Sequence, residues 1–71
     1  MTARQWIDRF AAVLGVDPPT PEEWSALLRL AAEAAHGSER VAAPISCWLA
    51  GRAGRSPDEA LEAAAAVTAE G

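Results

Sequence analysis

Four residues that can do chemistry or recognise a charged group occur close together in the segment 36–48. They are His36, Arg40, Cys47 and Trp48. A histidine can transfer protons or bind a metal, and an arginine can form paired hydrogen bonds with a carboxylate or a phosphate. A cysteine becomes a nucleophile when its thiol is deprotonated. A functional site of this chain could therefore be built in this segment.

Each of these residues also has an ordinary structural interpretation. His36 could cap the last carbonyl groups of the preceding helix, and Arg40 could pair with a carboxylate of the last helix. Cys47 is the only cysteine, and nothing in the sequence places a base beside it, so it is expected to be a small buried residue. One histidine and one cysteine fall short of the four ligands of a zinc site. We therefore predict no catalytic residue, no metal site and no cofactor.

Binding is the remaining role for this segment. The spacing predicts that Pro44 is the first residue of a helix, where the free N–H groups of the first turn can bind an anion. The candidate binding residues are His36, Arg40, Pro44, Ser46 and Trp48. They would form either a surface for a protein partner or a small pocket for an anion or another ligand. A concave pocket with converging polar groups would favour the second alternative.

Capping signals and hydrophobic spacing divide the chain into four helices. A serine or threonine followed three residues later by Glu or Gln forms a capping box at Thr2, Thr20 and Ser56. Gly15 and Gly37 stand where helix-ending glycines are expected. The predicted helices span residues 3–14, 21–36, 44–53 and 57–70, and no segment has the two-residue period of a strand. The expected fold is all-α: a compact four-helix domain over residues 1–71, arranged as an orthogonal or irregular bundle.

The apolar stripes predict which side of each helix is buried. Trp6 and Trp24 fall on the stripes of the first two helices, and both are expected in the core. The third helix is apolar nearly all round, so it is expected to be central and buried, with Ile45, Trp48 and Leu49 on its inner side. Much of the 51% hydrophobic content is alanine, which buries little area, so the tryptophans must supply much of the core. An exposed tryptophan would instead indicate a partner surface.

Length and charge restrict the classes of function. A chain of 71 residues has a small core, and one cysteine cannot form an internal disulfide, so self-association or docking on a larger protein would supply stability. The net charge of −4 argues against nucleic acid and anionic membranes as partners. The third helix is too apolar, and the fourth too acidic, to be a DNA-recognition helix. No apolar run approaches the ~20 residues that span a bilayer, and a lone free cysteine fits the reducing cytoplasm, where we expect the protein.

Residues 31–51 carry an ordered series of short motifs. These are Ala35-His36, then Arg40, then Ala42-Ala43-Pro44, then Leu49-Ala50-Gly51. The order resembles the central signature of a small actinobacterial domain of unknown function. Val41 stands where that signature has a proline, and Ser46-Cys47 replaces two threonines.

The family it resembles occurs alone or fused behind nucleotidyltransferase domains similar to molybdenum-cofactor guanylyltransferase. The resemblance therefore implies an accessory role near molybdenum-cofactor maturation, with a nucleotidyltransferase as the candidate partner. Our leading hypothesis is a non-enzymatic accessory or interaction domain whose surface includes His36, Arg40 and the start of the third helix. The alternative is the anion- or ligand-binding module that uses the same residues.

Overall fold

The computed structural model describes all 71 residues and contains four α-helices and no strand. The helices are α1 (Ala3–Leu14), α2 (Pro21–Gly37), α3 (Ala42–Arg52) and α4 (Pro57–Glu70). The predicted all-α, four-helix fold is confirmed. The predicted bounds agree with α1 and α4 and differ by one residue at the end of α2. α3 begins two residues earlier than predicted and ends one residue earlier.

Three helices begin with the capping boxes that the sequence predicts. The hydroxyl oxygens of Thr2, Thr20 and Ser56 accept hydrogen bonds from backbone N–H groups three residues later, at N···O distances of 3.1, 3.1 and 3.2 Å. In return, the side chain of that third residue accepts from the backbone N–H of the capping residue. Gly15 ends α1 with a φ of 77°, a left-handed conformation that glycine adopts without steric cost. These contacts are local, so the sequence alone fixes where the helices start.

The start of α3 follows a different pattern from the one predicted. The N–H groups of Ala42 and Ala43 donate to the carbonyl oxygens of Glu39 and Arg40, at 3.0 and 3.1 Å. These turn-like bonds begin the helix two residues before Pro44, which becomes its third residue. A proline is tolerated there because the first-turn position needs no intrahelical N–H donor. The prediction that Pro44 opens the helix is therefore wrong.

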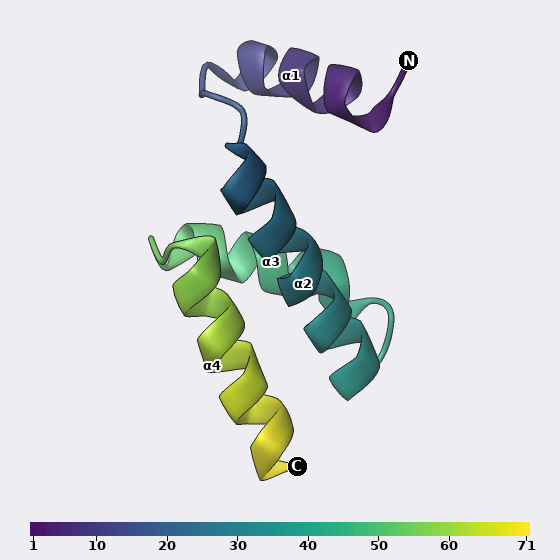
Figure 1. Cartoon of the computed structure of the whole chain (residues 1–71), viewed down its shortest axis with the longest axis vertical. Helices are drawn as coiled ribbons and strands as arrows, with labels where there is room; N and C mark the ends of the chain where they lie inside the picture. Colours follow the sequence, from purple (N-terminus) through teal and green to yellow (C-terminus); the bar gives the residue numbers. More distant parts are fainter.

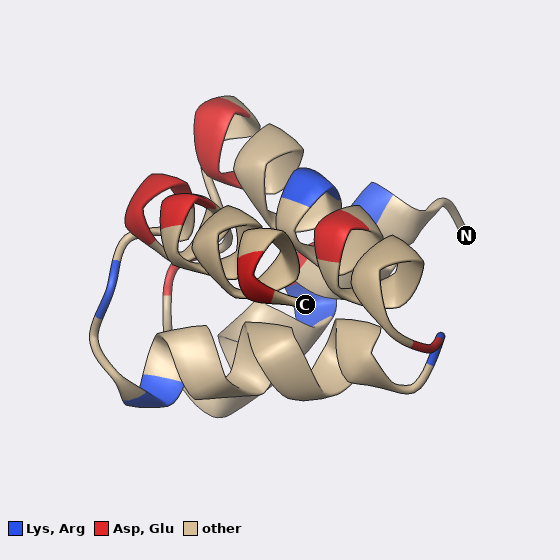
Figure 2. Ribbon diagram, turned by 90° about the horizontal axis from the view of Figure 1, so that it is seen from below, with Lys and Arg blue, Asp and Glu red and all other residues tan.

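α2 is the central helix and packs against both α3 and α4. α2 and α4 run in the same general direction, and α3 crosses behind them (Figure 1). Seen from below, α3 lies beneath the other helices and carries no acidic residue (Figure 2). The small core consists of Leu30, which is only 2% exposed, and the alanines Ala11, Ala26 and Ala60. None of the helices combines the length and the apolar character needed to cross a bilayer.

α1 lies across the start of α2, away from α3 and α4 (Figure 1). This placement leaves Trp6 54% exposed, whereas Trp24 on α2 is half-buried. The prediction that Trp6 belongs to the core is therefore wrong. Trp6 is exposed because only a narrow side of α1, which includes the buried Ala11, packs against the rest of the chain.

Candidate interaction surface

Most of the large apolar side chains at α3 lie on the side that faces away from α2. Val41, Ile45 and Trp48 are each more than half exposed, and Trp48 reaches 61%. Their spacing of four and three residues places them in one row along the helix. We call these three residues the α3 stripe. The prediction that α3 is buried is wrong, because no residue of α3 is buried, and Ile45 and Trp48 do not face inwards. Leu49 is also exposed, but it borders the other helices.

The side of α3 that does face the other helices is built from small residues. They are Ala42, Ala43, Ser46, Cys47 and Ala50, all half-buried. The Cys47 sulfur lies 4.0 Å from the carbonyl oxygen of Leu27, so α3 approaches the backbone of α2 closely. The hydroxyl of Ser46 donates to the carbonyl oxygen of Ala43 at 2.8 Å and so uses its polar group within its own helix. Small residues permit this close approach, and the large residues then remain outside.

A cationic group borders the stripe at its C-terminal end. The guanidinium of Arg52 lies over the Trp48 ring, 5.1 Å from its centroid. A cation–π contact of this kind at an exposed position contributes about 0.5–1 kcal/mol. Arg52 therefore orders one face of the indole and places positive charge beside it.

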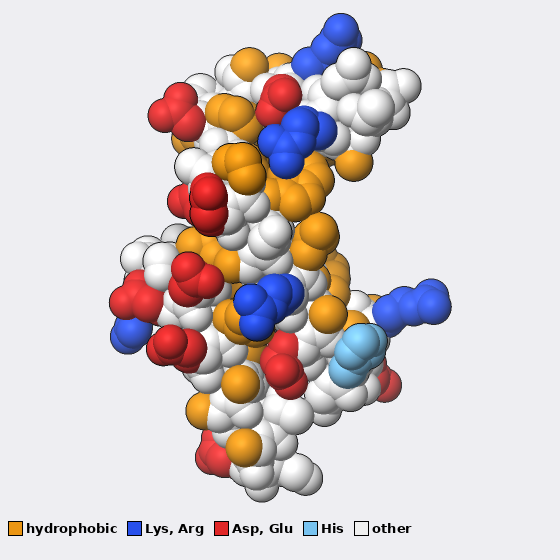
Figure 3. All heavy atoms as spheres, in the orientation of Figure 1, with side chains coloured by type: hydrophobic (Ala, Val, Ile, Leu, Met, Phe, Trp, Pro, Cys, Tyr) orange, Lys and Arg blue, Asp and Glu red, His pale blue; other side chains and the backbone are white.

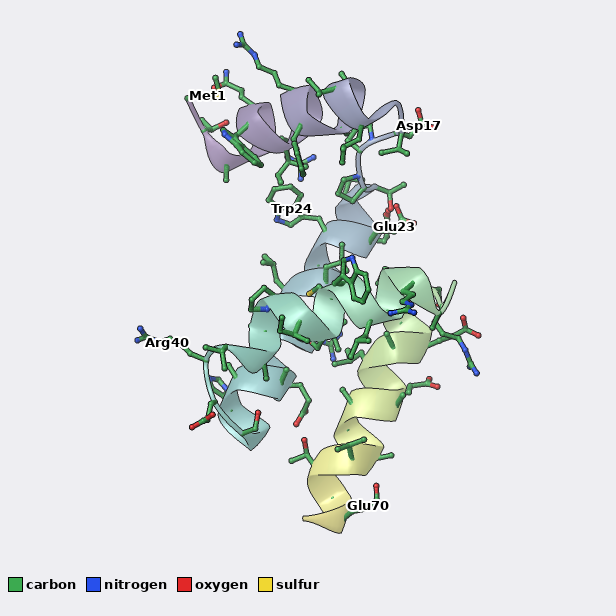
Figure 4. All side chains as sticks on the ribbon, turned by 180° about the vertical axis from the view of Figure 1, so that it is seen from behind. Met1, Asp17, Glu23, Trp24, Arg40 and Glu70 are labelled. Atoms are coloured by element: carbon green, nitrogen blue, oxygen red, sulfur yellow. The ribbon has the colours of Figure 1, made fainter.

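His36 and Arg40 lie near the other end of α3 and are both exposed. His36 is the only histidine of the chain and is seen at the surface in pale blue in Figure 3. The Arg40 side chain extends away from the body of the molecule (Figure 4). The hydroxyl of Ser38 donates to the carbonyl oxygen of Ala34 at 2.7 Å, so Ser38 takes the capping role that was considered for His36. Two polar side chains are thus available to a partner but do not enclose a ligand.

The first turn of α3 offers fewer donors to an anion than the sequence suggested. The N–H groups of Ala42 and Ala43 are engaged with the preceding turn, and Pro44 has no N–H group. The structure therefore does not supply the free N–H groups on which the anion-binding alternative depended.

An open groove of about 530 Å³ lies between the second half of α2, α3 and the second half of α4. Its lining includes Ser46 and Leu49 but neither His36 nor Arg40. Of the five candidate residues, Ser46 is therefore separated from the exposed ones. Elsewhere, no three His, Cys, Asp or Glu side chains come together in a metal-binding arrangement.

α1 adds a second exposed apolar area that the sequence analysis assigned to the core. The ring centroids of Trp6 and Phe10 lie 5.0 Å apart. Both residues are exposed, as is Leu14. Arg4 stacks over the ring of Trp24 at 4.7 Å and thereby fastens α1 to the start of α2. The signal that could have revealed this surface is the shortage of large residues elsewhere, because an alanine-rich body offers α1 little to pack against.

The fold and this surface define the class of protein: a small all-α domain with exposed apolar helix faces and no enclosed polar site. More particularly, the chain belongs to the family described as domain of unknown function DUF6457, whose model matches residues 1–70. No curated protein and no solved structure matches the chain. The predicted membership of a domain family of unknown function is therefore confirmed.

Proposed function

We propose that this chain is a non-enzymatic interaction domain that binds another protein molecule through the α3 stripe. The observation that carries the proposal is the outward orientation of Val41, Ile45 and Trp48 on a helix whose small residues face inwards. Solvation of such a row is unfavourable, and a partner that covers it gains roughly 25 cal/mol per Å² of apolar area. A central tryptophan with aliphatic neighbours is also the composition of many binding hot spots.

Polar residues at the ends of the stripe supply the rim of the proposed surface. His36 and Arg40 lie at one end and Arg52 at the other, and all three are exposed. Residues 36–55 contain three arginines and one glutamate, a local charge of +2 within a chain of charge −4. An apolar centre with a polar rim is the usual anatomy of a protein interface. The charge favours an acidic rim on the partner.

The identity of the partner belongs to the same proposal. The resemblance of residues 31–51 to a domain fused behind nucleotidyltransferases supports a nucleotidyltransferase of molybdenum-cofactor synthesis, with this chain as its cytoplasmic accessory. Fused domains often correspond to separate proteins that bind each other, so the stripe and its rim are the surface we assign to that contact.

Affinity capture of tagged protein from its native cytoplasm tests the proposal, with captured proteins identified by mass spectrometry. Wild type should recover a nucleotidyltransferase, Trp48→Ala should lose it, and Arg40→Ala should weaken it by a few-fold. Truncation of a central anchor typically costs about 2 kcal/mol or more, roughly a thirtyfold change in Kd. Arg9→Ala, an exposed arginine on α1, is the matched control and should bind as wild type. Equal recovery with wild type and Trp48→Ala would remove the α3 stripe from the function.

A further inference from the structure

Two helices of the chain leave apolar side chains without a partner. They are Trp6, Phe10 and Leu14 of α1 and Val41, Ile45 and Trp48 of α3, all of them exposed. We call these six residues the α1–α3 face. α1 lies above α3 when the molecule is seen from behind (Figure 4). The six side chains thus belong to two helices that are far apart in the sequence.

The total surface of the chain is larger than its mass predicts. The accessible surface is 5451 Å² for a chain of 7.4 kDa. Folded monomers of this mass expose roughly 4,200 Å², so the excess is about 1,200 Å². Two copies that each buried this excess would form an interface of roughly 2,400 Å², within the range of obligate homodimers.

The small core indicates that the missing partner is needed whenever the chain is folded. Only 4 of the 71 residues are buried, and three of these are alanines. A core of this size leaves a small domain close to instability unless a further interaction contributes. A second copy is present wherever the chain is present, and a two-fold arrangement lets each exposed helix pair be covered by the other.

We propose that the α1–α3 face is covered by a second copy of this chain in a two-fold symmetric dimer. The inference rests on the proposed function, since it names the occupant of the apolar surface of an interaction domain. Because the α3 stripe belongs to both surfaces, the second copy covers it in the free protein, and a nucleotidyltransferase that binds the stripe displaces that copy.

Sedimentation equilibrium over a wide range of protein concentrations tests the dimer directly. Wild type should have twice the 7.4 kDa mass of one chain and should dissociate on dilution. Ile45→Glu places a charge in the centre of the face and should weaken the dimer at least a hundredfold. Val67→Glu is the matched control, because Val67 is an exposed apolar residue like Ile45 (67% against 59%) but lies on α4, outside the face. This variant should keep the dimeric mass.

Tryptophan fluorescence of the wild type keeps the test decisive if Ile45→Glu does not fold. Trp6 and Trp48 lose contact with water in the dimer, so dilution should shift the emission to longer wavelength together with the loss of mass. A wild type that stays monomeric at every concentration overturns the inference, as does a dimer that survives Ile45→Glu. Capture of a nucleotidyltransferase is measured separately, so a monomer that still captures it refutes only the dimer. A dimer that captures nothing refutes only the nucleotidyltransferase partner.

Discussion

The closeness of Gly37 to Thr68 predicts that Gly37→Ala changes the free energy of unfolding in opposite directions with threonine and with alanine at position 68. Gly37 is the last residue of α2 and has no positive φ, so an alanine fits its backbone. A Cβ added there would lie 2.7 Å from Thr68 Oγ1 and 3.3 Å from its Cγ2. The hydroxyl of Thr68 donates to the carbonyl oxygen of Ala64 at 3.2 Å, and Thr68 must give up this bond to turn away.

The magnitude follows from the two opposing terms. Glycine to alanine in a helix gains up to about 0.5–1 kcal/mol of unfolding free energy. Displacement of Thr68 costs about 1 kcal/mol for its hydrogen bond, and about 0.5–1.5 kcal/mol more for the shifted rotamer of a stiff side chain. Gly37→Ala should therefore destabilise the chain by about 0.5–2 kcal/mol, and it should stabilise the chain by up to about 0.5–1 kcal/mol when Thr68 is already alanine.

Thermal unfolding followed by circular dichroism measures this cycle, with all four proteins at one concentration so that association cannot differ between them. In a domain of this size 1 kcal/mol changes Tm by roughly 4–8 °C. Gly37→Ala should lower Tm in the wild type and raise it in the Thr68→Ala background. The same change of Tm in both backgrounds would show that the ends of α2 and α4 do not touch, and the reasoning would be refuted.

Three further predictions concern the core, the attachment of α1 and the cap of α4. Leu30→Ala should cost about 2–4 kcal/mol in denaturant unfolding, whereas exposed Leu28→Ala should cost under about 1 kcal/mol. Arg4→Ala should speed amide hydrogen exchange in α1 by removing the contact with the α2 indole, and Arg9→Ala should not. Hydrogen bonds from the backbone and the hydroxyl of the capping serine hold the pKa of Glu59 below 4.5. The stabilisation of the fold by ionised Glu59 is therefore fully present above about pH 4.5, the ordinary pKa of a glutamate, and it is lost as the pH falls through the lower pKa of the folded chain. An NMR titration with Glu59→Gln as the control would show this.

The parts of the fold that follow from the sequence are those decided by neighbouring residues. Thr20 and Glu23 complete each other's hydrogen bonds across three positions, and Pro21 between them fits only a helix start. The start of α3 depended instead on a turn. Ala42 bonds to Glu39 there, and neither residue type signals a helix start.

The orientation of α3 could not be predicted, because periodicity does not say which of two apolar sides of a helix is buried. Both sides of the helix are apolar, with Ile45 and Trp48 on one and Cys47 and Ala50 on the other. The usual rule buries the larger side. Close approach to the backbone of α2 instead selects the smaller side, and this contact joins residues twenty positions apart. The candidate site in segment 36–48 stays a prediction, and the structure moves Trp48 from the expected core to the surface.

This reversal makes the size of Cys47 a test of the packing. Its sulfur lies 4.0 Å from the carbonyl oxygen of Leu27, with no room for a longer side chain unless α3 retreats from α2. Cys47→Leu should therefore cost about 1–3 kcal/mol through overpacking, although leucine is the more hydrophobic residue. Cys47→Ala should cost less than about 1.5 kcal/mol, because it removes one atom from a half-buried site. Chemical denaturation of the two variants decides the point: a stabilising Cys47→Leu would mean that α3 buries its large side after all.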